Sequence, residues 1–173
     1  IDLNKYDFSS LVTSNKVLNY LASIGCPGNC SFCSWGGKHN WVHLASERVL
    51  DDVEHLVKRY GLKSIWFYDA TLTVNKAFIL EIANGLIKRN LKITWRCFGR
   101  IAELEKYSYK DFEILANSGL DQIFVGIESI HKDCQKILRK RLSPETVTKV
   151  VSNIKPFPIG LNLAFLFAAP NMP

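Results

Sequence analysis

Three cysteines lie within the ten-residue stretch GCPGNCSFCS, residues 25–34. The thiolates of Cys26, Cys30 and Cys33 are soft ligands that suit zinc or an iron–sulfur cluster. Their short spacing, with a proline and a glycine in the turn, allows one loop to wrap a metal centre. A closed tetrahedral site needs four ligands, and this loop supplies three. The fourth position is therefore filled from elsewhere or kept open for a ligand.

The other two cysteines, Cys97 and Cys134, lie alone in apolar surroundings and are interpreted as small buried hydrophobic residues. A secreted disulfide framework would contain an even number of cysteines at wider spacings. The chain contains neither a signal-peptide pattern nor an apolar run near the roughly 20 residues that span a bilayer. These features predict a cytoplasmic protein without a membrane span.

The net charge of +6 is spread along the chain rather than gathered in a stripe. This distribution favours a solvated surface, although a basic chain leaves nucleic acid or another anionic molecule open as a partner. The length of 173 residues suits one domain. The first residue is Ile1, and the last residues, FAAPNMP, directly follow an apolar run, so we expect this sequence to be part of a longer polypeptide.

Two periodicities alternate along the chain. Apolar residues at helical spacing, with Gly or Pro near the ends, predict helices, and short β-branched and aromatic runs predict strands. The expected helices are 46–60, 75–89, 108–119, 131–141 and 144–154. The expected strands are 17–23, 63–69, 92–98, 121–129 and 160–169.

This alternation predicts an α/β fold with a parallel sheet that curls into an open or closed barrel. In such folds the chemistry gathers where the strands end. Polar residues occur at these positions: the cysteine loop, Asp69, Arg96 with Arg100, and Glu128 with Ser129. The arginines would line the pocket or face solvent, according to the alternation of each strand.

The spacing Cys26-x3-Cys30-x2-Cys33, with Phe32 before the last cysteine, resembles the signature of the radical S-adenosylmethionine (SAM) superfamily. The stretches YDATLTVNK, TWRCFGRI and GIES resemble the members that often carry an upstream cobalamin-binding domain. This resemblance implies a partial (β/α)6 TIM-like barrel of parallel strands, with about five βα units present and the C-terminal end truncated. It also implies a 4Fe-4S cluster on the three cysteines, with SAM on the open iron and an external one-electron reductant.

The same resemblance implies further roles at matching positions. Phe32 would lie beside the adenine of SAM, and Asp69 near its amino group. Glu128 and Ser129 would bind the ribose hydroxyls of SAM. Lys140, or alternatively Arg141, would bind the SAM carboxylate.

Residues 1–16 would be a linker from an upstream domain, and residues 17–173 the radical SAM core, incomplete at its C-terminus. Cobalamin would be held by a domain outside this chain. The fifth strand departs from the family pattern because Ala168 and Ala169 stand before Pro170 where a glycine is usual. The substrate and the net reaction are not encoded in these residues.

Other interpretations remain open at this point. The cysteines could hold a structural zinc with His39 or His43 as the fourth ligand, which would make the chain an interaction module. Asp69 could cap the turn that follows it. The tryptophans Trp35, Trp66 and Trp95, like the phenylalanines, are expected in the core rather than around a cofactor.

Overall fold

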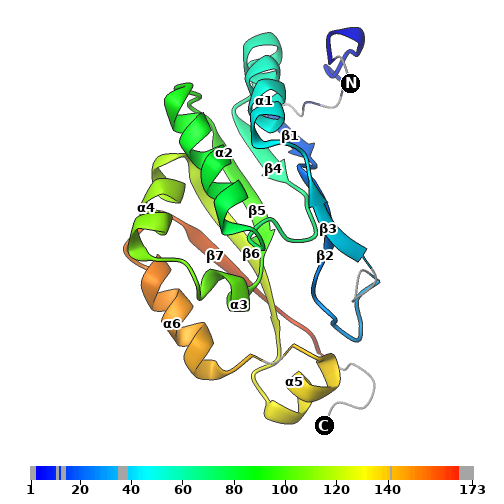
Figure 1. Ribbon diagram of the computed structural model, residues 1–173, viewed down its shortest axis with the longest axis vertical. Coiled ribbons are helices and arrows are strands. Elements are labelled where there is room, and N and C mark those ends of the chain that lie inside the picture. The colour runs from blue at the N-terminus through cyan, green and yellow to red at the C-terminus, as the bar shows by residue number, and fades with distance from the viewer. Residues whose placement is uncertain (1–2, 11, 13–14, 35–38, 141, 168–173) are drawn as a thin grey trace.

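The computed structural model describes residues 3–10, 12, 15–34, 39–140 and 142–167. Its centre is an open sheet of five parallel strands in the order β1-β4-β5-β6-β7 (Figure 1). The strands are β1 (Val17–Tyr20), β4 (Ser64–Phe67), β5 (Thr94–Gly99), β6 (Leu120–Glu128) and β7 (Gly160–Phe165). The prediction of an α/β fold with a parallel sheet, consistent with a partial TIM-like barrel, is confirmed.

The long helices follow the strands and lie on one face of this sheet (Figure 1). They are α1 (Ser46–Tyr60), α2 (Lys76–Lys88), α4 (Tyr109–Asn117) and α6 (Pro144–Ile154). Three are capped as their sequences dictate: the side chains of Asn75, Ser108 and Ser143 each accept a hydrogen bond from a main-chain N–H in the first turn. The shorter elements are η1 (Leu3–Lys5), α3 (Ile101–Leu104) and α5 (Lys132–Leu138).

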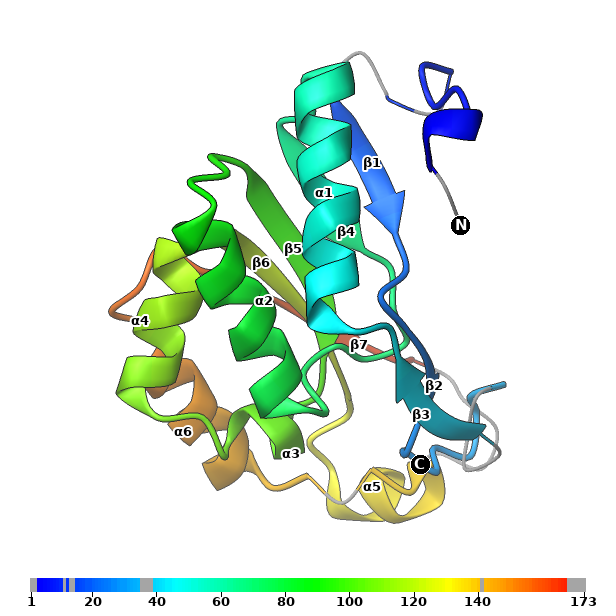
Figure 2. The same ribbon diagram turned by 45° about the horizontal axis from the view of Figure 1, so that its top comes forward.

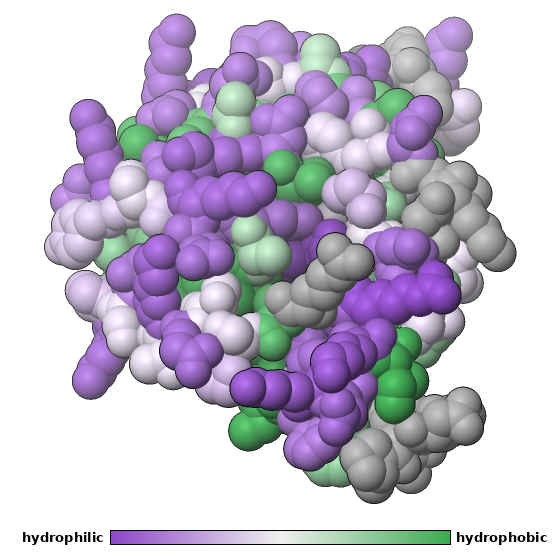
Figure 3. Space-filling model, turned by 60° about the horizontal axis from the view of Figure 1, so that its bottom comes forward, coloured by the Kyte–Doolittle hydropathy of each residue, from purple (hydrophilic) through white to green (hydrophobic). Residues whose placement is uncertain are grey.

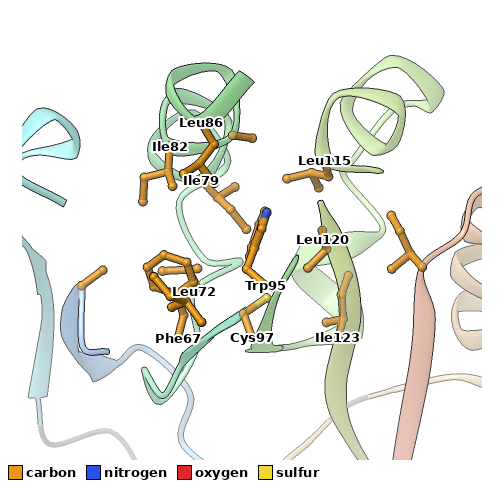
Figure 4. Close-up of a cluster of buried hydrophobic side chains, with 14 of the residues drawn as sticks. Phe67, Leu72, Ile79, Ile82, Leu86, Trp95, Cys97, Leu115, Leu120 and Ile123 are labelled. Atoms are coloured by element: carbon orange, nitrogen blue, oxygen red, sulfur yellow. The ribbon is translucent and has the colours of Figure 1, made fainter. Parts of the chain in front are cut away.

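The hydrophobic core fills the space between the sheet and these helices (Figure 4). Alternate residues of each strand point into it, so Phe67, Trp95 and Cys97 are completely buried. The indole N–H of Trp95 donates to the carbonyl (3.2 Å) and to the hydroxyl (3.1 Å) of Ser118, which satisfies its one polar group. Cys97 and Cys134 are both buried, as expected, and burial raises the pKa of the Cys97 thiol.

The expected strand 17–23 is wrong in one respect, because the chain leaves the sheet after Tyr20. Residues Ser23–Cys26 form a separate strand, β2, which pairs antiparallel with β3 (His39–His43), an element that the sequence did not predict. Gly25 within β2 has a φ of +97°, and a Cβ atom there would lie 2.3 Å from the carbonyl oxygen of Asn40. This irregularity in the β2–β3 pairing thus requires glycine, and the resulting hairpin carries the cysteine loop.

The segment before β1 packs against the end of α1 where it is described. The main-chain N–H of Phe8 donates to the hydroxyl of Tyr60 at 3.1 Å, and the two rings meet edge-on. Trp35, Arg141 and the pair Ala168–Ala169, to which the sequence assigned roles, lie outside the described residues. Among the helices that are described, none has the length and apolar character needed to cross a membrane.

Candidate functional site

The cysteine loop begins where β2 ends, at Cys26, and runs beside α5 (Figure 2). The N–H of Gly28 donates to the sulfur of Cys26 at 3.3 Å, and the N–H of Cys33 donates to the carbonyl of Cys30 at 3.3 Å. Cys26 and Cys30 are half-buried, Cys33 is exposed, and none of the three forms a disulfide. The loop thus presents three free thiols from one tight turn.

Two cations lie next to this loop. The guanidinium of Arg100 lies so close to Gly28 that a Cβ atom there would be 2.9 Å from its Nη1. Burial raises the pKa of the Cys30 thiol, and the charges of Lys140 and Arg100 act in the opposite direction. Cations beside the cysteines stabilise the thiolate form that binds metal. This donor set of three thiols and two nearby cations therefore fits an anionic iron–sulfur cluster.

A buried network holds Arg100 in place, and little in the sequence indicates it. The hydroxyls of Thr71 and Thr73 donate to Oε2 of Glu103 at 2.7 and 2.5 Å, and Thr73 Oγ1 also accepts from the N–H of Arg100 at 3.2 Å. The other oxygen of Glu103 lies 3.7 Å from the Arg100 guanidinium. The only sequence signal was the run of polar residues DATLT directly after a strand.

Glu128 and Lys140, which the resemblance assigned to different parts of SAM, lie together. Lys140 Nζ is 3.3 Å from Glu128 Oε1 and donates to the carbonyl of Gly126 at 2.7 Å. Glu128 has a φ of +63°, a left-handed conformation that is unusual for a non-glycine residue. It lies at an irregularity in the β6–β7 pairing, and a Cβ atom on Gly126 would collide with its carboxylate. Such strain is typical of functional positions.

Two more of the residues expected to contact SAM, Phe32 and Ser129, lie on the cysteine loop and directly after Glu128, respectively. Phe32 is 47% exposed on the cysteine loop, so its ring is accessible to a ligand. The hydroxyl of Ser129 accepts a hydrogen bond from the N–H of His131 at 3.1 Å, next to the start of α5. Ser129 thus shapes the connection from β6 to α5 and still lies beside Glu128.

Asp69 is completely buried between the main sheet and the hairpin. Its carboxylate accepts hydrogen bonds from the hydroxyl of Ser23 at 2.5 Å and from the N–H of Ala22 at 3.4 Å. Burial raises the pKa of this carboxyl, although these hydrogen bonds lower it. Both bonds fix the chain where it leaves β1 and enters β2. Asp69 therefore positions the strand that leads to the cysteine loop.

The sheet face away from the long helices, called here the open face, carries a second aromatic cluster. Trp66, Phe98 and Phe124 have ring centroids 5.1–5.7 Å apart. All three are half-buried, so the expectation that they belong to the main core is wrong, whereas it is right for Trp95. The guanidinium of Arg96 lies 5.9 Å from the centroid of the Trp66 ring, which places Arg96 on this same face.

An apolar pocket of about 520 Å³ connects the open face to the cysteine loop. Its lining includes Leu21, Ile24, Cys26, Cys33, Tyr68 and Phe98. Two of the three thiols thus face a hydrophobic space large enough for a small organic molecule.

The histidines proposed as zinc ligands are found on β3. The ring of His43 packs against Phe78, with centroids 4.2 Å apart, at the end of the hairpin opposite to Cys26. His39 pairs with Cys26 in the hairpin register, but its side chain lies outside the described residues. In the described part of the chain, no group of three or more His, Cys, Asp or Glu side chains is arranged to hold a single metal ion.

The parallel sheet, the strand-end cysteine loop and the paired Glu128 and Lys140 together define an α/β core with its thiol and charged side chains gathered near the strand ends. Comparison with known proteins identifies the class. The model of the Radical SAM superfamily matches residues 20–163, and the chain therefore belongs to this superfamily. The family's cofactors are a 4Fe-4S cluster and SAM, and its members need a reductant; membership does not favour the zinc module.

The chain is 29% identical over 154 residues to an uncharacterized methyltransferase of Pyrococcus horikoshii, covering 87% of this chain and 33% of that protein. It is 26% identical to the bacteriochlorophyllide d C-12(1)-methyltransferase of Chlorobaculum tepidum, covering 93% of this chain and 37% of that protein. The structure of the cobalamin-dependent SAM radical enzyme OxsB superimposes with a TM-score of 0.75 at 23% identity, over 86% of this chain and 23% of that one. The chain spans about a third of the length of these curated relatives.

Proposed function

We propose that this chain is the core of a radical SAM enzyme that cleaves SAM reductively, for hydrogen abstraction or for cobalamin-dependent methyl transfer. A 4Fe-4S cluster bound by Cys26, Cys30 and Cys33 would supply the electron that breaks the sulfonium C5′–S bond of SAM. The observation that carries the proposal is the placement of the Cys26 and Cys33 thiols in the lining of an apolar pocket, with Arg100 and Lys140 beside the loop.

The protein's own residues would orient SAM. Lys140, whose side chain is 9% exposed, would bind the SAM carboxylate, and Glu128 would accept hydrogen bonds from the ribose hydroxyls with Ser129 beside it. Phe32 would lie against the adenine. Asp69 would act through Ala22 and Ser23, because its carboxylate is completely buried and each of its oxygens accepts a hydrogen bond from one of these residues.

The apolar pocket would receive the reacting part of the substrate and exclude water from it. The relatives include methyltransferases as well as a cyclase, the anaerobic magnesium-protoporphyrin IX monomethyl ester cyclase of Rubrivivax gelatinosus. We therefore assign no single net reaction to this chain. We further propose that residues 1–16 connect this core, residues 17–173, to an upstream domain that holds cobalamin. Five free cysteines suit the reducing cytoplasm, where we place the protein.

The proposal is tested by anaerobic reconstitution of the full protein with iron and sulfide, followed by measurement of bound iron and of SAM cleavage under dithionite. We expect about four irons per chain and reductant-dependent cleavage. Cys30→Ala should abolish cleavage and lower the iron content. Cys97→Ala is the matched control, because it also removes one thiol but lies in the core.

The hypothesis of a structural zinc module predicts the opposite result. A colourless protein that holds one zinc, releases it after His39→Ala and leaves SAM intact would overturn the proposal. If the cluster model is right, His39→Ala leaves the iron content unchanged.

A further inference from the structure

The cysteine loop is joined to α5 by two hydrogen bonds. The N–H of Ser31 donates to the carbonyl of Leu138 at 3.2 Å, and its hydroxyl donates to the carbonyl of Ile137 at 2.7 Å. These acceptors are at the C-terminal end of the helix, where carbonyls lack partners within the helix. The end of α5 therefore lies directly against Ser31, the residue that follows Cys30. Figure 2 shows α5 beside the loop that follows β2.

The position of α5 is fixed from its buried side. Gln135 is 4% exposed; its amide nitrogen donates to the carbonyl of Ile127 at 3.1 Å, and its amide oxygen accepts from the N–H of Leu142 at 3.0 Å. Arg139 ends the helix with a φ of +54°. At this turn Arg139 is exposed, whereas the next side chain, Lys140, points inward to Glu128.

A cationic cavity of about 710 Å³ lies between the tip of the cysteine loop and α5. It is lined by Asn29, Arg100, Lys136, Arg139 and Lys140, and we call it the α5 cavity. Figure 3 shows the face of the molecule that carries α5, where hydrophilic side chains predominate around small hydrophobic areas. Ile137, which is 37% exposed, is one hydrophobic residue next to the loop.

The carboxylates near this cavity do not neutralise it. Glu128 and Glu103 pair with Lys140 and Arg100 inside the fold. Asp133 lies 3.3 Å from Lys136 on the surface, where both side chains are more than 60% exposed and the pair is weak. The guanidinium of Arg139 has no acidic partner among the residues that the structure describes. The outer rim of the cavity therefore remains positive.

We propose that the α5 cavity is the docking site of an acidic one-electron carrier protein. The inference rests on the proposed function, which requires an electron to reach the group held by the cysteine loop. One electron leaves the carrier, which is oxidised, and reduces that group; no atom is transferred. A positive rim beside the loop attracts an acidic partner and brings the redox centre of that partner close to the cysteine loop. The distance that the electron must cross is then short. Ile137 offers the apolar contact that protein interfaces place among charges.

RNA would also be attracted to cations. The position of the cavity favours an electron carrier, because Asn29, the residue before Cys30 in the cysteine loop, is part of its lining. A nucleic-acid site has no need of contact with the metal-binding turn, whereas an electron donor requires it.

The test uses the double variant Lys136→Glu, Arg139→Glu and a purified acidic flavodoxin as the probe. Within the described residues, neither side chain forms a hydrogen bond or ion pair with a proposed SAM ligand, so dithionite-driven SAM cleavage should match that of the wild type. The matched control is Lys88→Glu, Lys92→Glu, which reverses two exposed cations near the start of β5, whereas α5 follows the C-terminal end of β6.

Binding of oxidised flavodoxin to the full protein, measured by calorimetry, gives a readout that does not depend on activity. The α5 variant should raise the dissociation constant about tenfold or more. It should also reduce the salt dependence of binding. SAM cleavage driven by reduced flavodoxin should fall in parallel, and the control should behave like the wild type.

Equal loss of flavodoxin affinity in both variants, or in neither, would overturn the docking site. Binding of a single-stranded RNA oligonucleotide that weakens only in the α5 variant, with flavodoxin binding unchanged, would overturn it as well. Failure of the wild type to cleave SAM under dithionite would instead contradict the proposed function, and the two failures are thus distinguished.

Discussion

On the helix-covered face of the sheet, Phe67 and Trp95 have no exposed surface, whereas on the open face Trp66, Phe98 and Phe124 are half-buried and contact one another. Strands β4 and β5 contribute to both sets from positions of opposite parity, and β6 supplies Phe124. One set is fixed by the helices packed on it (Figure 4), and the other lines the side on which the thiols and the apolar pocket lie. Whether an aromatic residue packs in the core or lies on the side of the candidate site therefore depends on its position along the strand and not on its residue type.

The largest effect that we expect is from Trp95→Ala, on the helix-covered face. It removes a completely buried indole together with its bonds to Ser118, and should lower the free energy of unfolding by about 3–5 kcal/mol. Chemical denaturation measures this loss. Trp66→Ala is the matched control on the open face and should cost about 1 kcal/mol, because its ring is only half-buried. Equal losses in the two variants would break the comparison.

A smaller effect is expected at the junction between the two faces. Asp69→Ala leaves the Ser23 hydroxyl and the Ala22 N–H buried without an acceptor, and should lower the free energy of unfolding by about 2 kcal/mol. It should also lower iron incorporation, since the strand leading to Cys26 loses its anchor. An unchanged iron content would show that Asp69 does not position the loop.

The variant Asp69→Asn tests the same position through the pH dependence of the free energy of unfolding. Burial raises the pKa of the Asp69 carboxyl, so its contribution to stability is complete below the pKa of the unfolded chain, about 3.9, and is lost as pH rises through the raised value. Asparagine does not titrate. The stability of Asp69→Asn relative to the wild type should therefore increase between about pH 4 and pH 7.

The smallest effect is expected from Lys140→Ala, which should raise the dissociation constant for SAM about tenfold, or about 1.4 kcal/mol, because one charge-assisted contact is lost. Equilibrium dialysis of SAM against the reconstituted protein measures it. Lys136→Ala is the control, because it removes the same charge from an exposed position four residues earlier. If both variants bind SAM like the wild type, Lys140 does not hold the carboxylate.

The sheet could be predicted from the sequence because each of its strands is a short apolar run between helical patterns. The alternation in β5 even separates its two faces: Trp95 and Cys97 share one parity, and Arg96 and Phe98 the other. Reading that parity would have placed Phe98 on the open face. The resemblance of the cysteine spacing was likewise enough to give the family, which the family model confirms.

The hairpin could not be predicted, because β3 has the mixed sequence HNWVH and no apolar alternation. It is fixed by tertiary contacts instead. The indole N–H of Trp41 donates to the carbonyl of Thr71 at 3.2 Å, and His43 packs against Phe78. The hydrogen-bond network that holds Arg100 also depends on tertiary contacts, because Thr73 and Glu103 meet only when two different βα loops come together.

The bonds from Ser31 to the end of α5 have a structural consequence for the evolution of this enzyme. Leu138 accepts one of them, and Lys140 follows Leu138 by two residues, so the cysteine loop and the lysine proposed for SAM are linked through the end of α5. An insertion or deletion between Cys30 and Cys33 would displace both together. Homologues with a different loop length should therefore carry a compensating change in the length of α5.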